Sequence, residues 1–63
     1  MTEEELKIQL ALGSLSDDMR IELANNSSTS KKILAILSTD EDYRVRYWVI
    51  SNPNTPPEVL NKL

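Results

Sequence analysis

The sequence predicts an all-α fold, a short α-solenoid of about five short helices. Three observations lead to this prediction. Helix-start signals recur along the 63 residues of the chain. Only one segment, residues 43–50, is rich in the β-branched and aromatic residues of strands, and it has no second strand-like segment to pair with. The last part of the chain also aligns with the part before it, without gaps, after a shift of 26 residues that places Met19 over Val45.

The first helix is predicted over Thr2 to about Leu12. Thr2 and Glu5 fit a capping box, in which the threonine hydroxyl accepts from the third helical amide and the glutamate reaches back. Gly13 ends the helix, as glycine commonly does just past a helix.

The middle of the chain predicts three more helices, separated by polar breaks. Residues 25–30 form one break, because Asn, Ser and Thr side chains compete for backbone hydrogen bonds. We expect Ser14 or Ser16 to cap the second helix and Thr29 or Ser30 to cap the third. A second break, at 38–40, precedes a fourth helix over about 41–51. The apolar residues expected to supply the inward surface of the first four helices are Leu6, Leu10, Met19, Ile21, Leu23, Ile33, Leu34, Leu37, Val45 and Val49.

The last helix is predicted from the segment 55–58, which reads as a second capping box between Thr55 and Glu58. Proline is favourable at the first helical position, because that amide has no partner within the helix. Val59, Leu60 and Leu63 are then expected to face inward.

The 26-residue shift aligns residues 19–37 with residues 45–63, and five of the nineteen positions are identical. The identical pairs are Arg20 and Arg46, Asn26 and Asn52, Thr29 and Thr55, Leu34 and Leu60, and Leu37 and Leu63. Ser27 and Ser30 stand where the second copy has Pro53 and Pro56. We interpret Asn26, Asn52, Pro53, Thr55 and Pro56 as structural positions of a repeated corner between helices.

Residues 45–63 match the pattern VR..V..NP.TP.E.L..L, with Asp40 and Asp42 matching a preceding D.D. This pattern resembles the leucine-rich repeat variant family, a HEAT-like helical repeat. The resemblance covers roughly residues 15–63 and implies a right-handed stack of short helices, some of 3₁₀ type. It divides the chain into an N-terminal capping helix (1–14), a first repeat (15–40) and a second repeat (41–63). Some family members carry an iron–sulfur cluster, which is not expected here because the chain has no cysteine.

Composition excludes several function classes. The chain has no Cys, no His and one Gly, so disulfides, the usual zinc sites and glycine-rich phosphate loops are absent. We expect no enzyme activity and no cofactor. The acidic clusters at 3–5, 17–18 and 40–42 are interpreted as helix starts, where acids favour the helix dipole, in preference to metal sites. No signal peptide or membrane span is evident, which favours a cytoplasmic protein, and Met1 followed by the Thr2 cap favours a true N-terminus.

The remaining candidates for function are partner-binding residues: Tyr43, Tyr47, Trp48, Arg46 and Arg20. Tyrosine and tryptophan are enriched at binding hot spots, although Trp48 equally fits a place in the core. Arg20 and Arg46 either grip an anion or bond acids and helix-end carbonyls within the fold, and Asp42 is placed to pair with Arg46.

We therefore expect a small protein-binding module, with a regulatory or inhibitory role toward a larger protein, and a homodimer through the exposed C-terminal end as one form of partner. Two alternatives stay open: a self-associating structural unit, and a nucleic-acid module using Arg20, Arg46, Lys31 and Lys32. The net charge of −3 argues against the latter.

Overall fold

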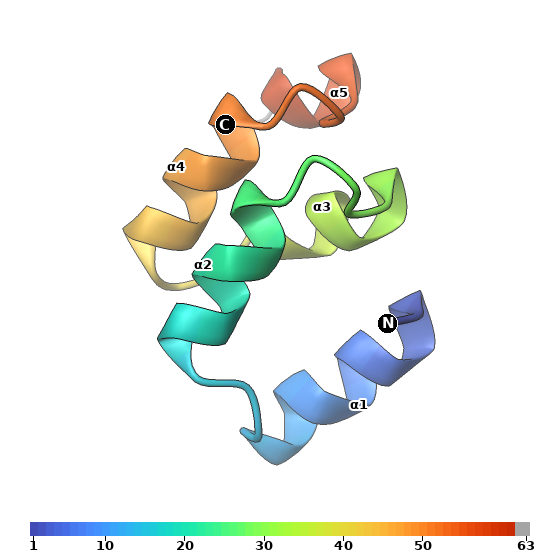
Figure 1. The fold of residues 1–63 in the computed structure, drawn as a ribbon, viewed down its shortest axis with the longest axis vertical. Helices are drawn as coiled ribbons and strands as arrows, with labels where there is room; N and C mark the ends of the chain where they lie inside the picture. Colours follow the sequence, from blue (N-terminus) through green and yellow to red (C-terminus); the bar gives the residue numbers. More distant parts are fainter. Residues whose placement is uncertain (62–63) are drawn as a thin grey trace.

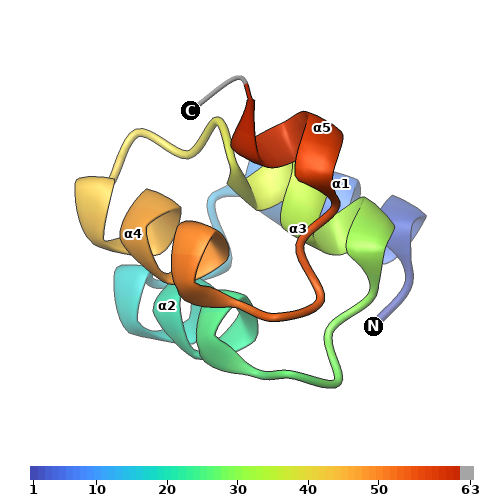
Figure 2. The ribbon, with the colours of Figure 1, turned by 90° about the horizontal axis from the view of Figure 1, so that it is seen from above.

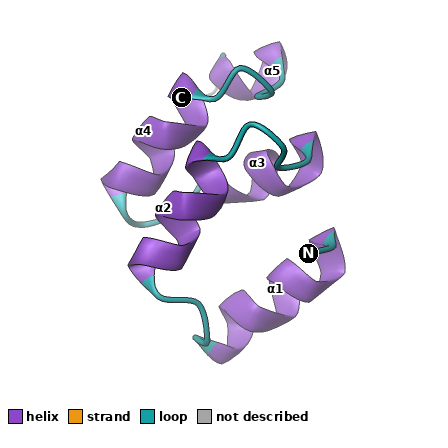
Figure 3. Ribbon diagram, in the orientation of Figure 1, coloured by secondary structure: helices purple, strands orange, loops and turns teal. Residues whose placement is uncertain are grey.

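Five short helices follow one another in a computed structural model that describes residues 1–61. They are α1 (Glu3–Leu12), α2 (Asp17–Asn25), α3 (Lys31–Leu37), α4 (Tyr43–Ser51) and α5 (Pro57–Leu60). All five are α-helices, and residues 1–61 contain neither a 3₁₀ helix nor a strand (Figure 3). The predicted all-α class is confirmed.

The helices are arranged in two layers (Figures 1 and 2). One layer holds α2 and α4, which run in the same direction and make the most extensive contact between helices. The other layer holds α1, α3 and α5, one after another, so that α1 and α5 lie at opposite ends (Figure 1). The radius of gyration is 10.4 Å, which is close to the value of about 11 Å for a folded chain of this length.

Side-chain caps begin the first four helices. The capping box at Thr2 is formed, with hydrogen bonds of 3.1 Å in both directions between Thr2 and Glu5. Gly13 ends α1 with a φ of 68°, a left-handed conformation that glycine adopts without steric cost. Of the serines left open by the sequence, Ser16 caps α2 and Ser30 caps α3. Asp42 caps α4, so this helix begins two residues later than predicted.

The start of α5 differs from the prediction. Pro56 is the capping residue and Pro57 the first helical residue, and no side chain caps the helix. The predicted capping box at Thr55 is therefore wrong: the Thr55 hydroxyl instead donates to the carbonyl of Val49, in the last turn of α4. Leu60 was expected to face inward but is 41% exposed. Leu63 lies outside the described residues.

A single core joins the two layers. Its fully or nearly fully buried members are Leu6, Leu15, Ala24, Ile33, Leu34, Leu37, Val45, Val49 and Val59. Most of them were predicted from helical spacing. Met19 is an exception among the expected inward residues, because 49% of it is exposed.

α2 and α4 are alike in length and in the corner that follows each helix. Both have nine residues and begin at residues 17 and 43. Each is followed by an asparagine in an extended conformation, Asn26 or Asn52. We call two residues that are 26 positions apart counterparts. The same three hydrogen bonds close both corners: Thr29 N to Asn26 O and Thr55 N to Asn52 O, Thr29 Oγ1 to Leu23 O and Thr55 Oγ1 to Val49 O, and Ser28 N to Asn26 Oδ1 and Asn54 N to Asn52 Oδ1.

Candidate functional site

An apolar strip runs along the exposed side of α4. It consists of Tyr43, Tyr47 and Ile50, which are 72%, 57% and 50% exposed, and we call it the α4 outer face. Because the three residues are four and three positions apart, they lie on one side of the helix. The opposite side carries the fully buried Val45 and Val49. α4 is thus apolar on both sides. Among residues 1–61, only the side with Val45 and Val49 is buried.

Trp48 supports this face from beside it. The indole is partly buried and packs against the core. Trp48 is therefore neither a fully buried core residue nor a fully exposed binding residue, the two roles that the sequence left open. Its ring meets that of Tyr47 edge to face, with centroids 5.2 Å apart and an interplanar angle of 79°. Aromatic pairs favour this geometry. Tyr47 thus makes an aromatic contact within the fold while 57% of it remains exposed.

Two of the three counterparts of the α4 outer face are covered in α2, whereas Asp17 is exposed. The three counterparts are Asp17, Ile21 and Ala24, of which Ala24 is fully buried and Ile21 is partly buried against the core. The Ala24 carbonyl accepts a hydrogen bond from Asn52, which places this end of the α2 face against α4. The corresponding positions on α4 are at least half exposed among residues 1–61.

Arg20 is used inside the fold. Only 8% of this residue is exposed. Its guanidinium donates to Asp40 Oδ2 at 2.7 Å, to the Leu15 carbonyl at 2.8 Å and to Asp17 Oδ1 at 2.6 Å. The bond to Asp40 is the main reason that the pKa of Arg20 is raised. This side chain therefore ties the start of α2 to the loop before α4, as one of the two sequence-based interpretations expected, and it does not line the α4 outer face.

Two further arginines are also held within the protein. Arg46 donates to the backbone carbonyl of Asp40 at 2.5 Å. The predicted pair between Asp42 and Arg46 is wrong, because Arg44 takes the Asp42 carboxylate at 2.8 Å. That hydrogen bond, together with the Arg44 backbone amide, lowers the pKa of Asp42 to about 2. The arginines that a nucleic-acid surface would need thus already have anionic or carbonyl partners.

Asn52 makes contacts that its counterpart Asn26 does not make. Asn52 is 6% exposed, and its Nδ2 donates to the carbonyls of Ala24 and Asn26 at 2.8 and 2.9 Å. Asn54 adds a 2.7 Å bond from its Nδ2 to the Thr29 carbonyl. These bonds connect the corner after α4 to the corner after α2.

Sequence reasoning missed Ile50, the third residue of the α4 outer face. The available signal was its place three residues after Tyr47, on the side of the helix opposite Val45. Reasoning from single exposed aromatics overlooked it because isoleucine is usually a core residue.

Other kinds of site find little support in the described part of the chain. Among residues 1–61, no three acidic side chains come together in a way that would hold a metal ion. None of the helices there has both the length and the apolar character that crossing a bilayer requires. The α4 outer face is therefore the candidate site that we develop.

Comparisons of the chain with protein-family models, with curated proteins and with solved structures found no match.

Proposed function

We propose that this protein is a small, non-catalytic binding module that recognises another protein through the α4 outer face. Tyr43, Tyr47 and Ile50 supply an exposed apolar strip, and two of its three side chains carry a hydroxyl. Tyrosine gives large contact area at a low cost in conformational entropy, and it is enriched among residues that dominate binding energy. This exposed strip is the single observation that carries the proposal.

We further propose that the chain is a short α-solenoid of the leucine-rich repeat variant or HEAT-like kind. The equal lengths of α2 and α4, their starts 26 residues apart and the three shared hydrogen bonds at each corner support this proposal. In a solenoid each unit covers the apolar side of its neighbour, and the last unit keeps one side open for a cap or a partner. The α4 outer face fits that position, because α4 packs against α2 and its Tyr43, Tyr47 and Ile50 remain exposed.

The test compares capture by the wild-type chain with capture by the double variant Tyr43→Ala and Tyr47→Ala. We expect a specific protein retained by the wild type to be lost with the double variant, while the thermal midpoint changes little because both rings are mostly exposed. The matched control is Leu12→Ala on α1, which removes a side chain that is 75% exposed and should leave capture intact.

Sedimentation of the same variants separates partner binding from self-association. A wild-type dimer that becomes a monomer in the double variant would assign the α4 outer face to a homodimer. Equal capture by wild type and double variant would reject this face as the binding surface.

A further inference from the structure

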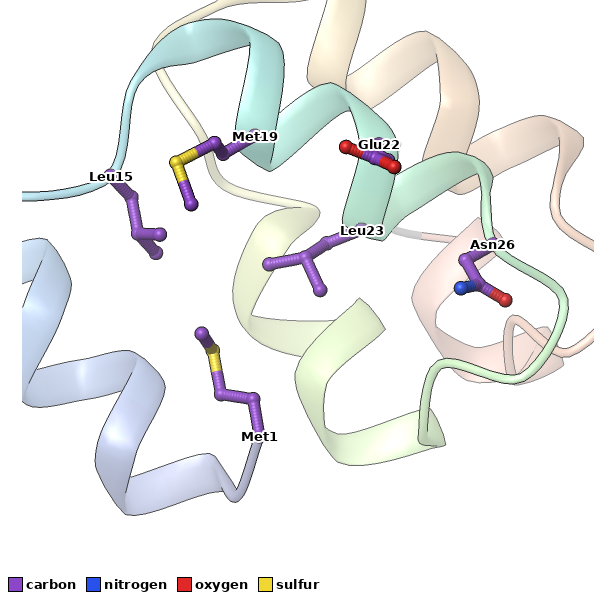
Figure 4. A pocket seen from close by; sticks show the side chains of 6 residues that line it. All are labelled: Met1, Leu15, Met19, Glu22, Leu23 and Asn26. Carbon is purple, nitrogen blue, oxygen red and sulfur yellow. The ribbon is translucent and has the colours of Figure 1, made fainter.

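A hollow lies between the N-terminus and α2 (Figure 4). It is distinct from the α4 outer face. Its volume is about 210 Å³. The residues that line it are Met1, Leu15, Met19, Glu22, Leu23 and Asn26. The lining is thus mostly apolar, with one carboxylate and one amide at its edge.

Three of these residues have counterparts that are covered in α4. Met19, Leu23 and Asn26 correspond to Val45, Val49 and Asn52, which are 0%, 0% and 6% exposed. On α4 this side is closed where the helix packs against α2 and α3. On α2 the same side faces the hollow, and Met19 remains 49% exposed. The packing around Val45, Val49 and Asn52 of α4 therefore shows how a helix would cover the corresponding surface of α2.

The side-chain amide of Asn26 points to the same conclusion. Its Oδ1 accepts the Ser28 amide at 2.8 Å, as Asn52 Oδ1 accepts that of Asn54. In Asn52 the Nδ2 donates to two carbonyls at the C-terminal end of α2. In Asn26 the Nδ2 is turned toward the hollow (Figure 4), and it donates to no group among residues 1–61. The bond to Oδ1 thus fixes the Asn26 side chain. Its Nδ2 lies where the C-terminal carbonyls of a neighbouring helix would accept a hydrogen bond.

We propose that this hollow is the docking site for a single amphipathic helix of a partner protein. The helix lies beside α2 and parallel to it, as α2 lies beside α4, and its C-terminal turn offers carbonyls to Asn26 Nδ2. Its inward side carries small and apolar residues, in the manner of Ile21 and Ala24. Glu22 at the rim favours a lysine or arginine on the partner, and the chain's net charge of −3 adds to that preference.

A second copy of this chain is a poorer occupant of the hollow. If it supplied its α4 as the docked helix, its α5 would follow at the position beside α3 that α1 already fills, because α1, α3 and α5 share one layer (Figure 1). A lone helix has no such conflict. The site is distinct from the α4 outer face, and it stands or fails independently of the function proposed for that face.

The probe is a stapled helical peptide with the sequence of residues 15–27, because α2 is the helix that lies against α4. The staple joins positions 18 and 22, which lie off the side that contacts α4. The peptide is titrated into ¹⁵N-labelled protein to about 1 mM, a range that detects weak complexes. We expect saturable shifts at Met19, Leu23 and the Asn26 side-chain amide.

Three variants make the test specific. Asn26→Asp keeps the oxygen that accepts from Ser28 but removes the donor, and we expect binding to weaken by about tenfold or more. Met19→Lys changes a half-exposed side chain, so the fold tolerates it, and binding should be lost. Tyr47→Ala alters only the other end and should bind as the wild type does.

The proposal is overturned if no saturable shift occurs, if the shifts centre on the α4 outer face, or if Asn26→Asp binds as tightly as the wild type. Without peptide, chemical shifts of Met19 and Leu23 that change with protein concentration would show that a second copy occupies the hollow. That result would also overturn the proposal.

Discussion

α2 and α4 are two helices of nine residues whose corresponding sides are used in opposite ways. In α2 the side with Ala24 is covered and the side with Met19 is open. In α4 the side with Val45 is covered and the side with Tyr47 is open. Local signals such as caps and corner asparagines are shared, so they do not decide which side is exposed. The place of each helix in the fold decides it, because α2 and α4 pack against each other through different sides.

Identical residues at counterpart positions can therefore contribute unequally to the free energy of unfolding. Asn26 and Asn52 make the same local bond to the second residue after them. Only Asn52 also bridges to another helix. Paired substitutions at counterpart positions therefore measure what the second helix adds, with the local chemistry held constant.

The largest effect is expected from replacing the bridging asparagine. Asn52→Asp keeps the oxygen that accepts from Asn54, but it removes the donor to two carbonyls and places a carboxylate beside them. We expect a loss of about 3 kcal/mol in the free energy of unfolding. Asn26→Asp should change stability by less than about 0.5 kcal/mol, since its amide is exposed. Urea unfolding of both variants gives the comparison, and equal losses would contradict it.

A smaller difference is expected for the apolar pair. Val45→Ala removes two methyl groups from a fully buried site and should cost about 2 kcal/mol. Met19→Ala, at a half-exposed site, should cost less than about 1 kcal/mol. A chain of 63 residues has a total stability of roughly 3–9 kcal/mol, so the first loss is a large share of the total. Thermal melts monitored by circular dichroism are sufficient, and a costlier Met19→Ala would show that the hollow is not open in solution.

The two N-terminal caps predict a difference in acid. Ser16 does not titrate, whereas the pKa of Asp42 is lowered from its ordinary value of 3.8 to about 2 by Arg44. The ionised form therefore stabilises the fold above pH 3.8, and this contribution is lost as the pH falls through about 2. Asp42→Ser should reduce the fall in melting temperature between these pH values. An unchanged acid profile would show that the bonds from Arg44 do not matter for folding.

The smallest effect concerns the prolines of the second corner. Asn26 and Asn52 have nearly the same backbone, with ψ of 119° and 124°, and extended backbone is what a residue before proline prefers. Ser27→Pro should therefore raise stability by about 0.4–1 kcal/mol, and Pro53→Ser should lower it by a similar amount. Both shifts act mainly through the unfolded chain. Chemical denaturation measures them, and a destabilised Ser27→Pro would mean that the first corner does not tolerate a fixed φ.

Most of the local structure could be predicted from the sequence. Capping residues, Gly13 and helical spacing gave four of the five helices to within about two residues. The exceptions arise where a side chain has a distant alternative partner. Thr55 looked like a cap by spacing, but its hydroxyl bonds the end of α4 instead. Asp42 and Arg46 have suitable helical spacing, but Arg44 is closer in the fold and takes the carboxylate.

The candidate site was only partly predictable for the same reason. The exposure of Tyr43 and Tyr47 followed from helical periodicity and is confirmed. The burial of Arg20 did not follow, because its partner Asp40 is twenty residues away in the sequence. The hollow beside α2 was also missed, since spacing alone makes Met19 and Leu23 equivalent to the buried Val45 and Val49.

The bond from Asn52 to the end of α2 has a consequence for how the molecule opens. It joins groups 26 and 28 residues apart, so detachment of the corner after α4 also removes the donor to two carbonyls at the corner after α2. Linear helical arrays tend to fray unit by unit from their ends. Here amide hydrogens in both corners should exchange with solvent at similar rates, through one shared opening, which would make this small chain a single cooperative unit.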